Sequence, residues 1–383
     1  MIAAKGRLKG RLWPSLDLHM TDLKPELSSG SVTISADIQE NAFRSQISGA
    51  LDLMEFIAVV EGAEYPLKGS VTGGMIVEQG EHLSLSGSLE CENAVVYSSG
   101  RELVVDGPVA FNQNVLTSSE LNLTSGGKKI RVTSGSLDMG DRPYFTGGLF
   151  IEGVGLGEGS DELSGFISAL DMDAAIELKR PNLYGIALDS FRADARLRNG
   201  KLHLSDMVIK GISGTAHGTA STDLDGKTGF DLVVSLKNAG IRQFFYAVAG
   251  EDSWVHGNMD LEGHLWGSTD SINGTLAFTA REGNIRKYAL FSRIFALLNI
   301  YRIIQTQNLE LTSKNFPYNV ISSTFTIRDS IVSFDDFYLD SNAMQLSAVG
   351  LYSLKTKEID AHIGIQPFET VDRAIGMIPL LGW

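Results

Sequence analysis

Few residues in this chain have the types and spacing that chemistry requires, and the histidines near residue 260 are the first to test. His256, Glu262 and His264 fall on one face of a segment with strand-like alternation, where they could meet at a metal ion. The same face carries Asn258 and Asp260 and has the composition of a solvated exterior. No neighbouring segment supplies a second ligand pair, such as two histidines four residues apart. The pattern therefore favours an exposed strand face, and we expect no metal.

Catalytic arrangements are equally hard to find. Asp335 and Asp336 form the most obvious carboxylate pair, but adjacent strand residues point to opposite faces and cannot act on one substrate. We interpret this pair as a turn. His217 lies in a Ser-, Thr- and Gly-rich strand with no nucleophile-elbow pattern nearby. The Gly-rich stretch 153–160 lacks the strand-to-helix context of a nucleotide-binding loop, so we interpret it as a linker. We expect no enzyme and no cofactor.

The composition disfavours two classes of partner. The chain has 383 residues and a net charge of −14, which disfavours nucleic acid, because its phosphates are bound by Lys and Arg. The same charge disfavours general adhesion to an anionic bilayer. The single cysteine, Cys91, cannot form an internal disulfide and is interpreted as a small buried strand residue. The 41 glycines and nine prolines suit many strands joined by tight turns.

The elements that would position a site are clearest between residues 255 and 305. Residues 255–266 and 272–280 alternate with a period of two, which predicts two strands with one apolar face and one polar face. Residues 284–305 then change to a helical period and predict an amphipathic helix. This helix has three interpretations: ordinary core packed on a sheet, the lining of an acyl-chain groove, or a membrane-surface helix.

Most of the remaining chain has the pattern of short strands. We divide it into residues 1–160, a series of strands, and residues 161–383, where the alternation is sharper. Asn199-Gly200 predicts a hairpin, Ile241–Ala249 a short helix, and the residues after Pro367 another short helix. The short connections predict antiparallel neighbours. Because so few helices can cover so many strands, either the sheet closes on itself or part of its apolar face is reserved for a ligand.

The C-terminal half resembles a known family. The motifs that carry the resemblance are Gly257-x-Met259-x-Leu261-x-Gly263-x-Leu265-x-Gly267, Gly274-x-Leu276-x-Phe278, Gly283-x-Ile285-x-Lys287, Met344-x-Leu346-x-x-x-Gly350, and Gly376-x-Ile378-Pro379-Leu380-x-Gly382. Together they are similar to the AsmA-like C-terminal region, over about Asp161 to Trp383. The AsmA-like family is related to TamB and YhdP and to bridge-like lipid transfer proteins.

The resemblance implies a fold, a function and a location. The implied fold is mainly β: a long antiparallel, strongly twisted, open β-groove with one amphipathic helix and short C-terminal helices. The implied function is phospholipid transfer between the bacterial inner and outer membranes, which supports outer-membrane biogenesis. The partners would be phospholipid acyl chains and bacterial membranes, besides envelope proteins of unknown identity. The implied location is the periplasm, with an inner-membrane anchor. This chain lacks that anchor and stops where the family pattern continues, so we expect a fragment.

The candidate lipid-binding residues follow from the apolar stripes. They are Met259, Leu261, Leu265, Leu276 and Phe278 from the strands and Leu290, Phe291, Ile294, Leu297, Leu298 and Tyr301 from the helix. Two rival functions remain open. One is a structural or adhesive β-solenoid with a packed core, and the other is an enzyme acting on envelope polysaccharide, which requires two converging carboxylates.

Overall fold

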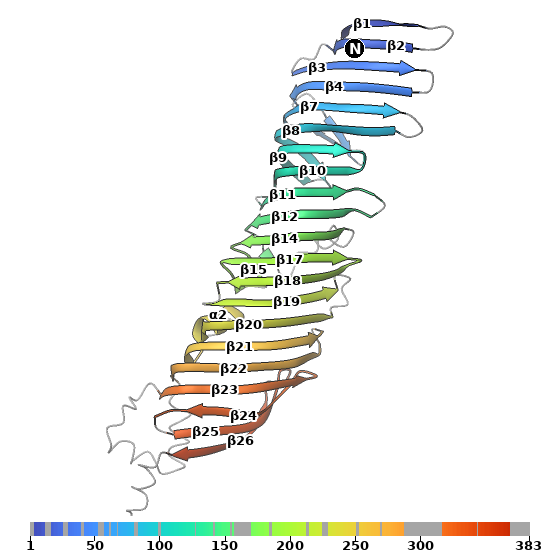
Figure 1. The fold of residues 1–383 in the computed structure, drawn as a ribbon. Helices are drawn as coiled ribbons and strands as arrows, with labels where there is room; N and C mark the ends of the chain where they lie inside the picture. Colours follow the sequence, from blue (N-terminus) through green and yellow to red (C-terminus); the bar gives the residue numbers. More distant parts are fainter. Residues whose placement is uncertain are drawn as a thin grey trace, which may run out of the picture. The chain divides into compact units, whose positions relative to one another are not determined.

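The structure is a computed structural model of the chain. It describes residues 4–367, with breaks at 12–16, 26–29, 40–41, 53–56, 61–62, 67, 80–82, 99–100, 127, 141, 154, 157–169, 184–185, 212–213, 224–228, 250–252, 269, 287–315 and 343. The described chain is mainly β, with open, mixed sheet structure (Figure 1). Two compact units divide it. Unit 1 comprises Met1–Val154, Gly159–Lys179 and Asp194–Gly200, and unit 2 comprises Gly155–Glu158, Arg180–Ala193 and Lys201–Trp383.

Unit 1 contains a sheet whose strands follow one another in chain order. The strands are β1 (Ala4–Arg11), β2 (Asp17–Pro25), β3 (Gly30–Gln39), β4 (Ala42–Asp52), β7 (Lys68–Gln79), β8 (Leu83–Ser98), β9 (Arg101–Asn112), β10 (Val115–Ser125), β11 (Lys128–Asp138), β12 (Tyr144–Glu152) and β14 (Asp171–Lys179). Each pair from β1 to β12 is antiparallel. A separate hairpin joins β5 (Ile57–Val60) to β6 (Ala63–Pro66).

The last pairing in unit 1 corrects the expectation of a purely antiparallel sheet. Strands β12 and β14 pair in parallel, with Tyr144 opposite Asp171 and Glu152 opposite Lys179. A parallel neighbour requires a connection that returns the chain to the end of the sheet where it started. The stretch from residue 153 to residue 170 is too long for a hairpin. Most of the linker predicted at 153–160 lies outside the described residues, and within it Gly155–Leu156 form a short strand.

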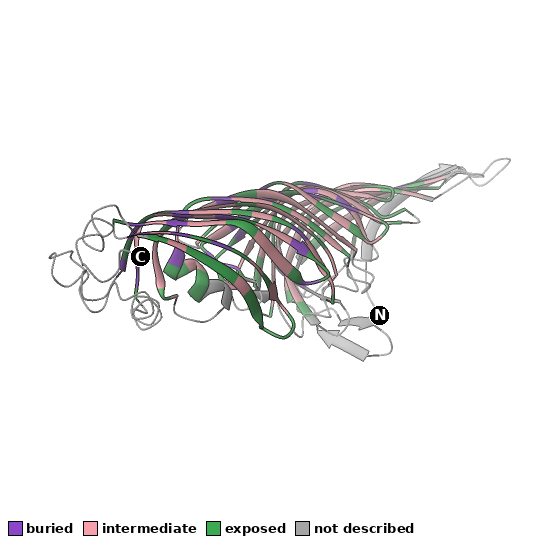
Figure 2. Cartoon of the chain, turned by 90° about the horizontal axis from the view of Figure 1, so that it is seen from below, coloured by how far each residue is buried: buried purple, intermediate pink, exposed green. Residues whose placement is uncertain are grey.

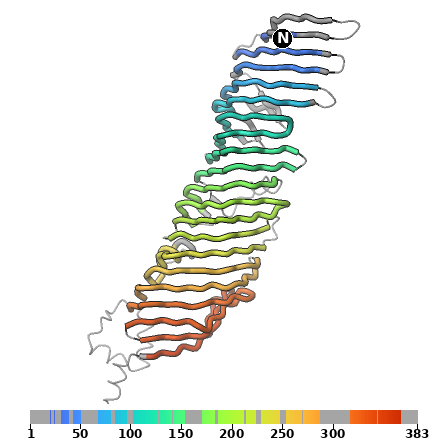
Figure 3. The backbone as a smooth tube through the Cα atoms, viewed as in Figure 1, coloured from blue at the N-terminus to red at the C-terminus, as the bar shows by residue number. Residues whose placement is uncertain are grey.

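Unit 2 contains a second run of strands, all antiparallel to their neighbours (Figure 3). They are β18 (Lys201–Lys210), β19 (Thr215–Asp223), β20 (Phe230–Gly240), β21 (Val255–Gly267), β22 (Ile272–Ile285), β23 (Phe316–Arg328), β24 (Ile331–Asp340), β25 (Met344–Ser353) and β26 (Ile359–Pro367). Among these described strands no ladder joins β18 to β26, so the sheet of this unit is open. The alternative that the sheet closes on itself is therefore wrong for the described part of unit 2.

The remaining described elements are one further strand, a small sheet, a turn and a helix. Strand β17 (Ser190–Arg198) contributes residues to both units, while β13 (Gly155–Leu156), β15 (Asn182–Leu183) and β16 (Ile186–Ala187) form a small sheet in unit 2. Asn199 and Gly200 form the turn between β17 and β18 with φ angles of 51° and 76°, as Asn-Gly predicts. The only helix among the described residues, α2 (Ile241–Ala249), matches its predicted bounds. It contacts β20 and β21.

β-bulges keep the apolar side chains on one face where the alternation is interrupted. Leu236 and Ala239 are three residues apart, yet both are buried, because the register of β20 against β21 shifts between them. The intervening Asn238 has a φ of 50°, and its N–H is bonded to Asp260 Oδ1 at 2.9 Å. A bulge adds one residue to a strand and so restores the phase of the following residues.

Two expectations about local structure are wrong. Asp335 and Asp336 lie inside β24 and not in a turn: the register against β25 shifts between Phe334 and Phe337, which is a bulge. Asp336 Oδ1 there accepts bonds from the Thr324 N–H at 2.7 Å and from the Ser323 hydroxyl at 3.1 Å. The start expected for the amphipathic helix at 284–305 is also wrong, because residues 284 and 285 belong to β22, which continues to Ile285. Residues 287–305 and the helix expected after Pro367 lie outside the described residues.

Candidate functional site

The apolar face of the unit 2 sheet is divided into two tracks that cross the strands. One track is fully buried, and we call it the buried band. Cross-strand pairing connects its members, which are Ala239, Met259, Ala280, Ile321, Leu339 and Leu346. All six belong to one buried core that also contains Ile241 of α2, which is 1% exposed. The buried band is therefore ordinary packed core.

The second track is neither buried nor fully exposed, and we call it the apolar lane. Its members are Leu204, Ala220, Leu232, Leu265, Leu276, Phe325 and Phe334, one from each strand from β18 to β24. Leu204 pairs with Ala220, Ala220 with Leu232, and Leu232 with Leu265. Leu276 pairs with Phe325, whose ring centroid lies 6.2 Å from that of Phe334. At ~4.8 Å per strand, the six steps from β18 to β24 give a lane about 29 Å long.

Glycines on the apolar face let large side chains lie flat across their neighbours. Gly263 pairs with Leu276, and a Cβ atom at Gly263 would lie 2.3 Å from Leu276 Cδ2. Gly274 pairs with Leu265, and a Cβ atom there would lie 2.9 Å from Leu265 Cδ2. The two leucines of β21 and β22 therefore occupy space that any other residue at the paired position would fill. Leu265 and Leu276 therefore lie flat over Gly274 and Gly263 within the apolar lane.

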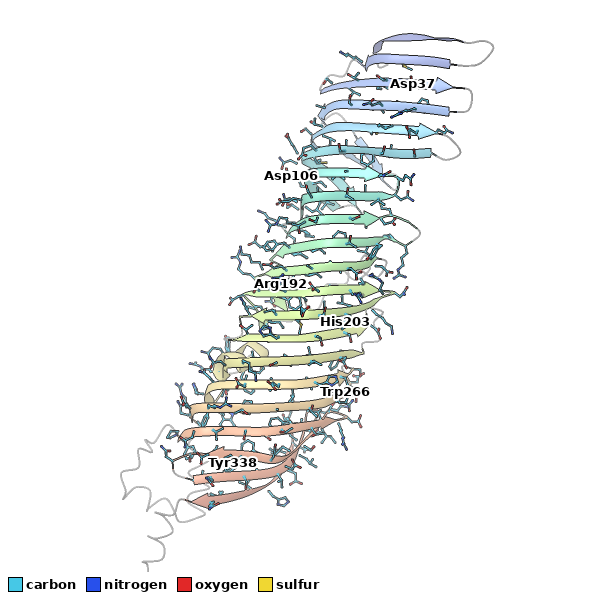
Figure 4. All side chains as sticks on the ribbon, viewed as in Figure 1. Asp37, Asp106, Arg192, His203, Trp266 and Tyr338 are labelled. Atoms are coloured by element: carbon cyan, nitrogen blue, oxygen red, sulfur yellow. The ribbon has the colours of Figure 1, made fainter. Side chains whose placement is uncertain are left out.

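The opposite face of the same strands is charged and hydrated. Lys237 contacts Glu262, Arg281 Nη1 lies 3.0 Å from Asp260 Oδ2, and His264 Nε2 lies 2.9 Å from Asp231 Oδ2. The Lys237 and Arg281 ion pairs and the His264–Asp231 hydrogen bond are exposed, so each contributes little to stability. Their alternation with the apolar residues gives each strand one polar face and one apolar face. Figure 4 shows the side chains along these strands and labels Trp266 on β21, whose ring lies 4.7 Å from that of His264.

Hydrogen bonds on this charged face also hold the bulge of β20. The Asn238 N–H bonded to Asp260, together with the Arg281 side chain, lowers the pKa of the Asp260 carboxyl. The carboxylate therefore remains charged in mildly acidic conditions and keeps its bond to the bulge. Asp260 therefore acts on local backbone geometry, through its bond to the Asn238 N–H.

Unit 1 has an apolar face of the same kind. Pairing connects Ile47, Met75, Gly87, Phe111, Leu116, Leu137 and Phe145 across β4, β7, β8, β9, β10, β11 and β12. Every member of this row is half-buried. Figure 2 colours the described strands by burial. Gly87 again makes room for a large neighbour, because a Cβ atom there would lie 2.8 Å from Phe111 Cζ. The N-terminal strands thus repeat the arrangement of the apolar lane.

The structure separates the candidate residues chosen from the sequence. Leu265 and Leu276 lie in the apolar lane. Met259 lies in the buried band and is 2% exposed, while Leu261 and Phe278 are partly buried and pack against the same core. The helical candidates Leu290, Phe291, Ile294, Leu297, Leu298 and Tyr301 lie outside the described residues.

Sequence reasoning missed the aromatic end of the apolar lane. Phe325 and Phe334 lie on adjacent strands, and Phe337 lies 6.3 Å from Phe334 between ring centroids. The spacing of Phe334 and Phe337 breaks the period of two, which hides their common face until the bulge is known. Two aromatic residues three positions apart, with two carboxylates between them, are the sequence signal that would have revealed the common face of Phe334 and Phe337.

The residues weighed as metal ligands or catalysts do not converge. Among the described residues, no group of three or more His, Cys, Asp or Glu side chains is placed to hold a metal ion. Burial raises the pKa of the Cys91 thiol, aided by Glu90 and Asp106, so its reactive thiolate is disfavoured. In the described part of the chain, no helix has the length and apolar character to cross a bilayer.

Known proteins offer no match. Comparison finds no matching family model, no matching curated protein and no matching solved structure. The apolar lane and the residues that line it therefore offer the main indication of function.

Proposed function

We propose that this protein binds phospholipid acyl chains along its half-buried apolar faces and conducts them between membranes. The observation that carries the proposal is the apolar lane, a track of seven apolar side chains, six of them Leu or Phe, that are half-buried in the described protein. Monomeric proteins rarely leave such contiguous apolar surface exposed unless something binds it. The charged face behind it keeps the same strands in water.

The dimensions of the apolar lane suit hydrocarbon chains. The hydrocarbon core of a bilayer is ~30 Å thick, so a chain from one leaflet reaches about 15 Å. A lane about 29 Å long thus accommodates roughly two such chains end to end. Burying a methylene group contributes ~0.8 kcal/mol, so a sixteen-carbon chain in water costs about 12 kcal/mol. A lane that covers even half of the chain removes much of that barrier.

The mode of action needs no reaction chemistry. The acyl chain would lie against Leu232, Leu265, Leu276 and Phe325, while the polar head group stays in solvent at one end of the chain. The lane crosses the strands, so a lipid moves along it by exchanging equivalent contacts from one strand to the next. The resemblance to the AsmA-like family supports the same proposal, with the bacterial periplasm as its setting and the two envelope membranes as donor and acceptor.

Site-specific photo-crosslinking tests the proposal on the full chain. A photoreactive amino acid is placed at Leu265 or Leu276 in the lane and, as a matched control, at Thr275, which is exposed on the charged face next to Leu276. After irradiation of the protein purified from a bacterial host, we expect phospholipid adducts at the two lane positions and not at Thr275. Mass spectrometry reads the adducts, and an organic extract of the untreated protein gives the stoichiometry.

The same measurement distinguishes lipid binding from the rival function. A structural or adhesive scaffold with a packed core would give a lipid-free extract and crosslinks from Leu265 and Leu276 to protein alone. Equal lipid labelling at all three positions would indicate non-specific adsorption and would also contradict the proposal.

A further inference from the structure

The last described strand, β26, carries apolar surface on an edge that has no partner among the described residues. Its residues Ile359 and Ile363 are 67% and 54% exposed, the highest values for apolar side chains of this sheet. They share a face with Ala361 and Ile365, because these four pair with Tyr352, Ala348, Gly350 and Leu346 of β25. Only β25 pairs with β26 in the described part of the chain, which leaves the second edge of β26 able to accept a strand.

The sequence of β26 is self-complementary about its midpoint. The strand runs from Ile359 to Pro367, so Ile363 is the central residue. If two copies pair antiparallel about a two-fold axis at Ile363, Ala361 lies opposite Ile365 of the other copy and Ile359 lies opposite Pro367. Every position of the strand then has a partner, and apolar residues meet apolar residues on one face.

The polar face of β26 fits the same pairing. Asp360 lies opposite Gln366 of the other copy, so no two carboxylates meet. His362 lies opposite Gly364, which leaves space for the imidazole ring. Moving the axis to His362 would bring two histidines together and leave one end of each strand unpaired. Only the register centred on Ile363 pairs all nine residues of the strand.

We propose that two copies of this chain associate through β26, forming an antiparallel pair centred on Ile363. The second copy covers Ile359 and Ile363 and joins the apolar faces of two sheets across the axis. Association by strand addition supplies main-chain hydrogen bonds along the edge except at Pro367, which has no N–H, and the alternate isoleucines supply specificity. The association depends on β26 alone and stands whether or not the apolar lane carries lipid.

Single cysteines test the register directly. In the Cys91→Ala background, Ile363→Cys places the two thiols of a dimer across the axis, where paired strands have Cα atoms about 4.5–5.5 Å apart. Ile359→Cys is the matched control, on the same strand and face. In the proposed register its copies are eight residues apart, or ~27 Å. We expect Ile363→Cys to give at least tenfold more covalent dimer than Ile359→Cys after mild oxidation or treatment with a short bis-maleimide.

Sedimentation of the unmodified chain supplies the second measurement. We expect a dimer at micromolar concentration and at least a tenfold weaker association for Ile363→Lys, whose exposed site tolerates a charge in the monomer. Equal crosslinking at positions 359 and 363 would overturn the proposal, as would stronger crosslinking of His362→Cys. A monomer at all concentrations would also overturn it.

Discussion

The hydroxyl group of Tyr318 donates a hydrogen bond to the backbone carbonyl oxygen of His256 at 2.7 Å. This bond crosses from β23 to β21 over β22, above a glycine: a Cβ atom at Gly283 would lie 2.3 Å from the Tyr318 hydroxyl oxygen. Tyr318 is 2% exposed and belongs to the same core as the buried band. One side chain thus links β23 to β21 across β22, the strand that lies between them.

Tyr318→Phe is expected to destabilise unit 2 and to flatten its alkaline pH dependence. Loss of the hydrogen bond costs about 1 kcal/mol at neutral pH, and more if the His256 carbonyl is left unsatisfied. Burial raises the pKa of Tyr318 to about 12. The unfolded chain releases this proton near pH 10, so the native protein loses stability on the order of 2 kcal/mol as pH rises from 10 to 12.

Thermal unfolding measured between pH 8 and 11.5 checks the alkaline prediction. The slope of the free energy of unfolding against pH should be smaller for Tyr318→Phe than for the native protein. Tyr246→Phe is the control, because Tyr246 is 67% exposed on α2. Identical slopes for the native protein and Tyr318→Phe would show that Tyr318 does not retain its proton on folding.

Gly263→Ala is expected to destabilise the protein through steric overlap alone. The added methyl group would lie 2.3 Å from Leu276 Cδ2 and 2.7 Å from the Thr275 carbonyl oxygen, and the carbonyl cannot move aside cheaply. Overpacking of this kind costs roughly 1–3 kcal/mol. Gly229→Ala serves as the control, because a Cβ atom there meets nothing closer than 3.9 Å. Denaturant unfolding of both variants compares the costs; equal stability would mean that the strands separate easily at Gly263.

Asp173→Asn is expected to weaken the junction between β12 and β14 where the pairing becomes parallel. Asp173 Oδ2 accepts bonds from the Tyr144 hydroxyl at 2.8 Å and from Arg198 Nη2 at 2.6 Å. The bond from Tyr144 and those from Arg198 and Arg196 lower the pKa of the Asp173 carboxyl. The carboxylate therefore stabilises the fold above its unfolded pKa of ~3.9, and this contribution is lost as pH falls further.

The size of the Asp173 effect is limited by solvent. The Asp173 and Arg198 side chains are 38% and 37% exposed, so screening reduces the loss in Asp173→Asn to about 1 kcal/mol or less at pH 7. Glu177→Gln on the exposed face of β14 is the control. Chemical denaturation at pH 7 and pH 3 should show a difference from the native protein that shrinks at the lower pH. A difference that grows toward pH 3 would contradict the assignment.

Leu276→Glu is expected to remove bound lipid while leaving the fold intact. A carboxylate in the apolar lane must either stay hydrated, which excludes hydrocarbon, or lose its water at a cost of several kcal/mol. We expect co-purifying phospholipid to fall at least fivefold. Thr275→Glu introduces the same charge on the opposite face of β22 and should leave the lipid content unchanged. A similar loss in both variants would indicate a general effect of charge or folding, which circular dichroism would distinguish.

The sequence by itself determined the strands, because a period of two is a local property of the chain. Buried Phe191, Ala193, Ala195 and Leu197 alternate with exposed charged residues in β17, as their pattern predicts. The turn at Asn199-Gly200 and the bounds of α2 could also be predicted, since the conformational preferences of a few consecutive residues decide them.

The tertiary structure alone decided which apolar residues are core and which remain open. Met259 and Leu265 lie on the same strand face and look equivalent in sequence. Met259 pairs with Ala280 in the buried band, whereas Leu265 pairs with Gly274 in the apolar lane. The parallel β12–β14 pairing and the bulge at Asp335-Asp336 were likewise hidden. The strand register, and whether an apolar side chain is covered by another element, depend on strands and helices far away in the chain. No local pattern encodes either property.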